Sequence, residues 1–570
     1  DFSLPFPGPD GHKKSHTPRK EGKSDCPIGR IFAAHIIWSL GRFLATVMTE
    51  YKEVSLPTSK TLPTTVVWHR LKASREEKEA RNNMRKETNL KTVLSEEELD
   101  ATVMKTSASS AEPRTVNLVF PEDLPPDPAA HAHVRRPRLW PPRGKEASLR
   151  WLEAPLEAAH REAREADRRT LILLTGPRAS GAPALFAQTL PHVHGIDFDV
   201  DAERREAEGA PRNLLARYAA LSTALFLNVQ RAPQFAALLA GLAGTRLEDP
   251  DVKAPKVVIA YASAELPVFA DLASNPFVKR LRLRTLVQGE LTGIQPDFPE
   301  RLLAHDFPSQ LSHDESNRDL ILEIAMHGGY PEGRLGSADE RHDFFHDLVR
   351  KICSTDLDAV SRLRSCMTLR KVYRTVGAAS GESLNVSKIA EFLGLGRPLV
   401  KRTLDALEAL YLVDALPAWP EGEKLGRALK SAKHYVTDSG WLCGLLGFCD
   451  SDPCALPPGS LGIVERLIAG WTRAQLAALT DVRPEWRLWH FALRTGLSIP
   501  MLLENERTGA LVAIETSSRE SVAPEDFVRL RKFRALLKDR PVTLLRLYCG
   551  QTVQSFDENE VALPLAFLWR

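Results

Sequence analysis

One short segment constrains the fold of this chain more than any other. Residues 170–175 read TLILLT, residues 176–181 read GPRASG, and residues 184–190 read ALFAQTL. The middle segment has the G-x-x-x-x-G spacing of a phosphate-binding loop, and an apolar strand before it and a helix after it are the context that such a loop requires. The sequence therefore predicts an α/β domain with a strand, a glycine loop and a helix in this order.

The two positions after the loop depart from that pattern. A phosphate-binding loop continues with Lys and Ser or Thr, but this chain has Ala182 and Pro183. Ala182 supplies neither a charge nor a side-chain donor, and Pro183 lacks the backbone N–H as well. Backbone N–H groups from Gly176 to Gly181, with Arg178 in place of the lysine, are the remaining candidates to hold the phosphates of a nucleotide. The alternative is a vestigial turn without a ligand.

The rest of the chain alternates between strand and helix patterns. Further apolar strands are expected at residues 224–229, 256–262 and 281–286, which predicts a parallel sheet covered by helices. Residues 385–413 read as helix, turn, helix and strand, a winged-helix-like order, with the leucines and valine of this segment facing inward: Leu393, Leu395, Val400, Leu404 and Leu407. Strands at residues 511–517 and 542–549 flank a helix at residues 524–537, which predicts another α/β unit.

These patterns predict four regions in an α/β chain. Residues 1–148 form an extended N-terminal arm, residues 149–315 an α/β domain with the glycine loop, residues 316–440 a helical and winged-helix region, and residues 441–570 a second α/β domain. Lys388, Arg397, Lys401 and Arg402 surround the second helix of the winged-helix segment. They are candidates to meet a nucleic-acid backbone, although such a segment also serves as a packing module.

Composition excludes several function classes. Lys and Arg number 76 and Asp and Glu 73, so the formal net charge of +3 gives no global field for coating nucleic acid. The seven cysteines include no C-x-x-C pair. This pattern argues for a reducing compartment and against a disulfide scaffold or a zinc site.

The arm is polar and rich in Pro and Arg, so it is expected to become ordered by lying on partner proteins. Basic residues surround an aromatic side chain in a cluster suited to RNA: Arg135, Arg136, Arg138, Trp140 and Arg143. The alternative is a solvated basic linker. Residues 28–51 carry Arg30, His35 and Arg42 within an apolar stretch, so we expect them to pack on protein and not to span a membrane. The chain begins at Asp1 without Met, which together with the arm suggests a processed mitochondrial protein on the matrix side, or otherwise a cytoplasmic one.

Several segments in collinear order resemble one family, the prokaryotic-type AAA-related P-loop ATPases with a winged helix and a C-terminal restriction-nuclease-like domain. The matching positions include Gln230, Arg231 and Pro233 after the second acidic strand, GELTG around Glu290, HGGYPEG at residues 327–333, Asp356, and SAKHYVTDSGW at residues 431–441. The resemblance covers roughly residues 150–550. It implies an AAA-like sheet domain and a nuclease-like C-terminal domain.

The same resemblance implies that the chemistry is missing. Leu227 and Asn228 stand where the family has metal-holding and water-activating carboxylates, and Ile259 to Ala262 stand where it has a polar run that senses the γ-phosphate. A Gly-Arg pair of the family falls at Pro276 and Phe277. In the nuclease-like domain Glu465 and Glu515 remain, whereas Pro500 and Ser517 take the places of the aspartate and the lysine.

We therefore expect a pseudoenzyme with no catalytic residue and no metal. Its expected role is that of a structural or assembly component of a large mitochondrial complex, such as a ribosome or a respiratory assembly, with protein subunits and RNA as the candidate partners. Two alternatives stay open: a regulator that binds a nucleotide in the relic pocket without hydrolysing it, and an ATPase with unorthodox residues.

Overall fold

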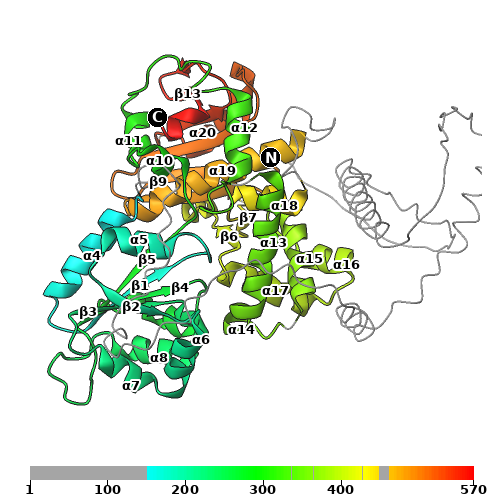
Figure 1. Cartoon of the computed structure of the whole chain (residues 1–570). Coiled ribbons are helices and arrows are strands. Elements are labelled where there is room, and N and C mark those ends of the chain that lie inside the picture. Colours follow the sequence, from blue (N-terminus) through cyan, green and yellow to red (C-terminus); the bar gives the residue numbers. More distant parts are fainter. Residues whose placement is uncertain (1–149, 336, 364, 427, 448–460, 539) are drawn as a thin grey trace, which may run out of the picture. The chain divides into compact units, whose positions relative to one another are not determined.

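In a computed structural model of the chain, the described residues are 150–570, except 336, 364, 427, 448–460 and 539 (Figure 1). The chain divides into two units, Asp1–Pro128 and Ala129–Arg570, and everything described below belongs to the second. The arm, with its candidate RNA cluster around Trp140, and the apolar stretch at residues 28–51 lie outside the described residues.

The first sheet has five strands, all paired in parallel, in the order β2-β3-β4-β1-β5. Its strands are β1 (Thr170–Thr175), β2 (His194–Asp197), β3 (Thr223–Leu227), β4 (Val257–Ala262) and β5 (Val278–Arg282). The glycine loop leaves the carboxyl end of β1, which lies between β4 and β5. This mixed α/β unit with a parallel five-stranded sheet is consistent with a P-loop ATPase-like domain.

The apolar run of β1 explains its place inside the sheet, because both of its faces are covered. Leu171 and Leu173 face one core and Ile172 and Leu174 face another. The first core contains side chains of α6 (Asp201–Gly209), α7 (Pro211–Arg217) and α8 (Pro233–Leu242). The second contains side chains of α4 (Glu153–Glu165) and α5 (Ala182–Thr189). Figure 1 shows the helices on either side of this sheet.

The edges of this sheet are less evident in the sequence. The strand expected at residues 281–286 overlaps β5 (Val278–Arg282) at Leu281 and Arg282 only, since the strand starts and ends earlier in the chain. The Lys and Arg side chains of β5 reflect its half-buried edge position. The opposite edge strand, β2, was not expected. It reads HGID, a short segment with little β-propensity, and its Gly195 is needed because a Cβ there would lie 2.0 Å from the carbonyl oxygen of Leu225 on β3.

The short helix α9 (Pro267–Ala270) lies between β4 and β5. The α-helices that follow the first sheet, up to the C-terminal sheet domain, are α10 (Gln288–Thr292), α11 (Phe298–Leu303), α12 (Arg318–His327), α13 (Ala338–Thr355), α14 (Leu357–Val360), α15 (Cys366–Ala378), α16 (Val386–Leu393), α17 (Arg397–Ala409) and α18 (Ser439–Leu446). The strands β6 (Val413–Leu416) and β7 (Lys433–Val436) pair antiparallel. The helix, turn and helix predicted within residues 385–413 are thus α16 and α17. The strand β6 begins only at Val413, the last residue of the predicted segment.

Local signals explain the bounds of α16 and α17. The side chain of Asn385 accepts from the backbone N–H groups of Ser387 and Lys388 at the start of α16, and Gly394 ends that helix in the left-handed region with φ 65°. Leu404 and Leu407 of α17 are buried, as the spacing predicts, while Leu393 and Leu395 are partly buried against the same core.

One cysteine pair is bonded, although the cysteine pattern argues for a reducing compartment. Cys353 on α13 and Cys366 at the start of α15 form a disulfide with their Cα atoms 5.6 Å apart. They are 13 positions apart in the sequence and match no spacing motif, so only the packing of α13 beside α15 reveals the pair. A single bond of this kind is not a disulfide scaffold, since the large cores hold the fold.

The C-terminal sheet has six strands in the order β12-β13-β11-β10-β9-β8. Its strands are β8 (Trp486–Ala492), β9 (Ser498–Asn505), β10 (Leu511–Ser517), β11 (Thr543–Tyr548), β12 (Gln554–Asp557) and β13 (Glu560–Pro564). The helix α19 (Leu461–Val482) shares a core with one face, and α20 (Val528–Leu537) shares a core with the other. The strands β10 and β11 and the helix between them lie where the sequence predicts them.

Candidate functional site

The glycine loop folds into a tight turn at the carboxyl end of β1. Gly176 is required there, because a Cβ would lie 2.1 Å from the carbonyl oxygen of Leu283. Ala179 and Gly181 adopt left-handed backbone with φ 62° and 94°, and the N–H of Ser180 donates to the carbonyl of Pro177 across 3.3 Å. Part of the hydrogen-bonding capacity of the loop is thus used inside the loop.

The side chain of Arg178 points into protein and is buried. Its Nε and Nη2 atoms donate to the two carboxylate oxygens of Asp356 at 2.6 and 2.7 Å, and its Nη1 donates to Asp199 at 2.7 Å. A guanidinium presents its donors in a planar fork that suits a bidentate pair. Arg178, the residue expected to replace the phosphate lysine, therefore lies between two carboxylates.

The carboxylate of Asp356 is fully buried, at 0% exposure, and is surrounded by donors. Besides Arg178 it accepts from Nε2 of Gln230 at 3.0 Å, from Oγ of Ser263 at 3.1 Å and from Oγ1 of Thr355 at 3.1 Å. Buried charges persist where they are paired and hydrogen-bonded. We call Arg178, Asp199, Gln230, Ser263 and Asp356 the arginine cluster.

Charge balance keeps the arginine cluster ionised. Burial disfavours the charge on Arg178, but the hydrogen bonds and charges of Asp356 and Asp199 outweigh it and raise the arginine pKa. Burial alone would raise the pKa of Asp199, yet Arg178, Lys351 and Arg231 lower it well below its usual range. Lys351 lies on α13, 3.1 Å from Asp199. The cluster thus joins the loop after β1 to the C-terminal end of α13.

The members come from the carboxyl ends of neighbouring strands. Arg178 follows β1, Asp199 follows β2, Gln230 follows β3 and Ser263 follows β4, while Asp356 ends α13. In open parallel sheets this edge is where ligands bind. The sequence identified Arg178, Gln230 and Asp356, but Asp199, Ser263 and Lys351 were missed. Ser263 was the findable one, because it directly follows the apolar run of β4.

Two positions that the resemblance assigns to catalysis, and a tyrosine on the neighbouring strand, have the following surroundings. Leu227 is buried, and Asn228 adopts left-handed backbone with φ 57° and donates from Nδ2 to Asp197 at 2.7 Å. The hydroxyl of Tyr261 on β4 donates to the carbonyl of Pro177 at 2.9 Å, and this hydrogen bond holds the loop against β4. The loop is thus tied to the neighbouring strand through its carbonyl groups.

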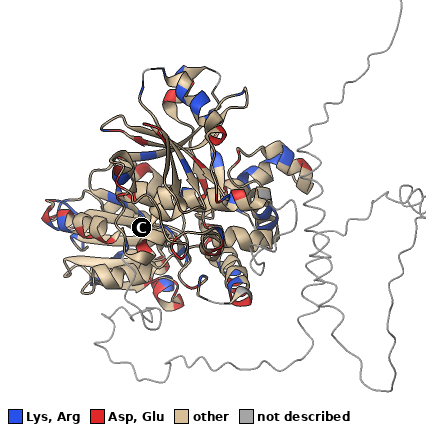
Figure 2. Cartoon of the chain, turned by 90° about the horizontal axis from the view of Figure 1, so that it is seen from above, with Lys and Arg blue, Asp and Glu red and all other residues tan. Residues whose placement is uncertain are grey.

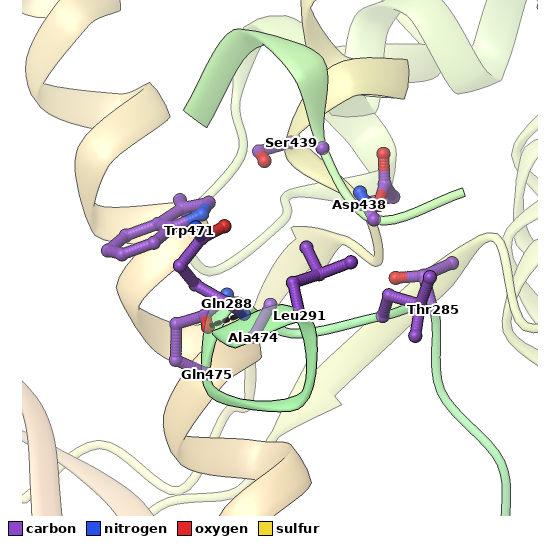
Figure 3. Close-up of a pocket in the computed structure, with 11 residues that line it drawn as sticks. Thr285, Gln288, Leu291, Asp438, Ser439, Trp471, Ala474 and Gln475 are labelled. Carbon is purple, nitrogen blue, oxygen red and sulfur yellow. Dashed lines mark hydrogen bonds between the residues drawn. The ribbon is translucent and has the colours of Figure 1, made fainter. Parts of the chain in front are cut away.

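One segment of the resemblance, HGGYPEG, packs beside the loop. A Cβ on Gly181 would lie 3.5 Å from Pro331, in ordinary contact. Asp438 accepts from the N–H groups of Gly329 and Trp441 at 2.8 and 3.1 Å. Figure 3 shows Asp438 near a cavity of about 10 Å³ that Gln288 and Gln475 also line, a volume about that of one water probe. These residues form a structural junction.

A second group of arginines surrounds Asp414 on β6. It accepts from Arg282 and Arg284 at 3.0 and 2.6 Å, and from Arg473 on α19 at 2.6 Å. Arg284 also pairs with Asp481 of α19 at 2.5 Å. Burial opposes ionisation of Asp414, but the three arginines lower its pKa far below the usual range. This group ties the end of the first sheet to β6 and α19.

Two arginines lie beside Glu515, a residue that the resemblance assigns to a nuclease-like site. Glu515 on β10 lies opposite Arg546 on β11, and the two side chains are 2.7 Å apart. Arg529 approaches the other carboxylate oxygen at 3.0 Å. Burial raises the pKa of Glu515, and the two arginines oppose that rise. Glu465 accepts from the backbone N–H and hydroxyl of Ser518, at 3.0 and 2.7 Å, so the two glutamates have separate partners.

Two further observations concern the described part of the chain alone. Within it, His, Cys, Asp and Glu residues form no group of three or more that could hold a metal ion. None of its helices combines the length and the apolar character that crossing a membrane requires. Charges of both signs are interspersed over its helices and loops (Figure 2).

Comparison with known proteins gives one family match and distant relatives. Residues 318–452, which contain α12 to α18, match a family described as "Domain of unknown function (DUF8612)". The uncharacterized proteins Mb2031c of Mycobacterium bovis and Rv2008c of Mycobacterium tuberculosis are each 24% identical to the chain over 418 residues. That match covers 72% of this chain and 83% of each relative.

Solved structures of P-loop AAA-type ATPases are among the similar folds. The ADP form of ORC2 from Aeropyrum pernix is 13% identical, with 58% of this chain and 97% of that chain covered and a TM-score of 0.26. RuvB from Thermotoga maritima is 14% identical, with 50% and 90% covered and a TM-score of 0.25. A STAND ATPase from Pyrococcus horikoshii has a TM-score of 0.19, and the chain spans only 47% of its length. Because these TM-scores are low, the fold is assigned from the sheet order and packing of the chain itself and not from these structures.

Proposed function

We propose that this chain is a catalytically inactive ATPase-like protein that serves as a structural or assembly component of a larger complex. The observation that carries the proposal is the pairing of Arg178 with both Asp356 and Asp199 at the carboxyl ends of the strands. A cation that receives a phosphate must be free to meet it, whereas this guanidinium is already matched by two carboxylates.

Electrostatics support this proposal. A triphosphate at the loop would bring further negative charge towards Asp199 and Asp356, and like charges in a buried site repel strongly. Releasing Arg178 to meet it would leave Asp356 buried without its partner, which typically costs about 3–5 kcal/mol. The binding of a nucleotide would have to exceed that cost.

The residues after the loop do not fit a magnesium nucleotide. In P-loop ATPases a hydroxyl after the loop lysine and an acidic strand residue hold the Mg²⁺ ion. The chain has Pro183 and Leu227 at those places, and neither side chain carries an oxygen. A metal-dependent transfer of a phosphoryl group is therefore not part of the proposed function.

A parallel argument applies to the C-terminal domain, which we propose is nuclease-like. Its elements follow the order α19, β8, β9, β10, α20 and β11, and its retained Glu515 faces arginines where a metal-dependent nuclease would place a cation. We propose likewise that α15, α16, α17 and the β6-β7 pair form a winged helix. In each α/β domain an arginine side chain of the chain itself then lies where a phosphate or a metal ion would otherwise bind.

Such internal ion pairs suit a protein that works through its surfaces. The arginine cluster and the group around Asp414 hold the strand ends against α13, β6 and α19 without any ligand. The long Pro- and Arg-rich arm at residues 1–148 adds a segment able to wrap partners. We propose a mitochondrial ribosomal or respiratory assembly as its setting, on the composition of the arm.

Titration with a fluorescent ATP or GTP analogue and Mg²⁺ tests the first half of this proposal. We expect no saturable binding at nucleotide concentrations up to about 1 mM, which corresponds to a binding free energy of about 4 kcal/mol. We also expect no turnover by the full chain. Micromolar binding that Gly181→Asp abolishes would establish the nucleotide-binding regulator instead. Turnover that Arg178→Ala abolishes, under conditions where that variant remains folded, would establish the unorthodox ATPase.

Sedimentation of the native protein from a gentle lysate tests the second half. We expect the protein to run in a heavy particle, and a shift after ribonuclease treatment would identify that particle as a ribonucleoprotein. Migration at the mass of a single chain would overturn the assembly role, whatever the nucleotide titration shows.

A further inference from the structure

A groove lies along α16 and the turn that leads to α17, and none of its lining residues belongs to the arginine cluster or to the surroundings of Glu515. Figure 1 shows where these two helices lie in the chain. Its volume is about 490 Å³. Its walls carry polar and charged groups together with backbone of the turn, and the lining residues on which the argument depends are Asn385, Lys388, Glu391, Gly394 and Arg397. The groove is open to solvent at the protein surface, so a flexible chain can enter it.

The cations of this groove are unmatched. Lys388 and Arg397 are exposed, and among the described residues no carboxylate lies within ion-pair distance of either. Lys401, one turn further along α17, is instead paired with Asp405 at 2.8 Å. Exposed cations that the protein leaves unpaired are free to meet phosphates. The single acidic group of the wall, Glu391, offers an acceptor to a sugar hydroxyl or a base amino group.

An exposed aromatic ring lies one helical turn from Lys388, just outside the residues that line the groove. The side chain of Phe392 is 52% exposed, and it is the one aromatic among the large apolar side chains exposed in the described range. Phe392 lies four positions after Lys388 on α16, and residues at this spacing are neighbours on a helix surface. A ring and a cation side by side offer a stacking face and a phosphate contact to one nucleotide.

We infer that the α16–α17 groove binds single-stranded nucleic acid, with a base on Phe392 and the backbone phosphates on Lys388 and Arg397. Duplex partners are disfavoured because a base inside a stacked helix cannot present its face to a side chain. The inference does not depend on the proposed loss of catalysis, since the groove shares no residue with the arginine cluster or with the surroundings of Glu515.

Fluorescence anisotropy of the full chain with a labelled 12-nucleotide oligouridine tests the inference, with the DNA oligonucleotide of the same length alongside. We expect saturable binding of at least one of them near 0.1 M salt. Phe392→Ala should weaken it roughly 10-fold or more, as losing a stacked base does. Lys388→Gln and Arg397→Gln should each lower the slope of log affinity against log salt by about 0.7, the value for one phosphate contact on a single strand.

Matched controls separate the groove from the rest of the chain. Met367→Ala removes an apolar side chain that is 59% exposed on α15 and does not line the groove, and Lys532→Gln removes an exposed charge on α20. Both should leave the affinity within twofold, and all variants should keep the melting temperature of the parent chain because the changed side chains are exposed. Absence of binding overturns the inference. Binding that Phe392→Ala and Lys388→Gln leave unchanged also overturns it, because the nucleic acid would then lie elsewhere on the chain.

Discussion

The Nε atom of Arg178 lies 2.6 Å from Oδ2 of Asp356, and its Nη2 atom lies 2.7 Å from Oδ1 of the same carboxylate. The pair joins the loop after β1 to the end of α13, across 178 positions of the sequence. Both side chains are buried. The arginine of the glycine loop is therefore already paired with a carboxylate of its own chain.

Replacing Arg178 should destabilise the protein strongly. Arg178→Ala leaves Asp356 buried without its charged partner, so the free energy of unfolding should fall by about 3–5 kcal/mol. Urea denaturation measures this loss. Arg212→Ala, a change at an exposed arginine on α7, should stay within about 0.5 kcal/mol. A loss below about 1 kcal/mol for Arg178→Ala would show that the pair does not hold the loop.

The sequence predicts the centre of the fold better than its contacts. The strands β1, β3 and β4 are fully buried apolar runs, and their position is evident because burial on both faces demands such runs. The edge strand β2, with the sequence HGID, gives no comparable signal. The caps Asn385 and Gly394 mark α16 for the same local reasons in sequence and structure.

The partners of Arg178 could not be predicted in this way. The sequence suggested that Arg178 could face an anion, but nothing local indicates that the anion belongs to Asp199 and Asp356, because these residues are brought to the loop only by the sheet order and by α13. The pairing of Cys353 with Cys366 could not be predicted from local sequence either. Nor could the pairing of Glu515 with Arg546, because it depends on the parallel register of β10 and β11.

Removing the disulfide should loosen the arginine cluster. The bond between Cys353 and Cys366 closes a short loop that contains Asp356. Cys353→Ser should lower the free energy of unfolding by about 3 kcal/mol, the value that chain entropy gives for a loop of this length. It should also speed amide hydrogen exchange at the end of α13. Dithiothreitol should reproduce both effects in the parent chain. In the Cys353→Ser, Cys366→Ser double variant it should change neither the free energy of unfolding nor the exchange rate, and a further change in that variant would show that the disulfide is not the cause.

The pair of Glu515 and Arg546 should behave as a structural unit. Arg546→Ala leaves the buried Glu515 with Arg529 as its remaining ion-pair partner, so the free energy of unfolding should fall by about 3 kcal/mol. Glu515→Gln, combined with Arg546→Ala, should cost less than the sum of the single changes. Arg507→Ala at an exposed position serves as the control. Strict additivity in denaturation experiments would argue against coupling of the two side chains.

A buried histidine should make the C-terminal sheet sensitive to mild acid. His490 on β8 is 0% exposed, and its Nδ1 finds no hydrogen-bond partner among the described residues. Its Nε2 lies 3.0 Å from the carbonyl oxygen of Ser431. Burial, and then the charge of Lys433, lower its pKa from 6.5 to about 4. The folded protein thus keeps this imidazole neutral at pH values where the unfolded chain protonates it.

The sign of the effect follows from that difference. Since the unfolded chain binds the proton first, the free energy of unfolding should decrease as the pH falls from 6.5 to about 4, by about 3 kcal/mol in total. Urea denaturation at several pH values across this window should show a smaller decrease for His490→Gln than for the parent chain, because the substituted side chain does not titrate. His342→Gln, at an exposed position on α13, should retain the parent decrease. Parallel pH profiles for the parent chain and His490→Gln would show that another group causes the acid sensitivity. Asp199 and Asp414 would not be that group, because their lowered pKa values confine their loss of stabilisation to pH values below about 4.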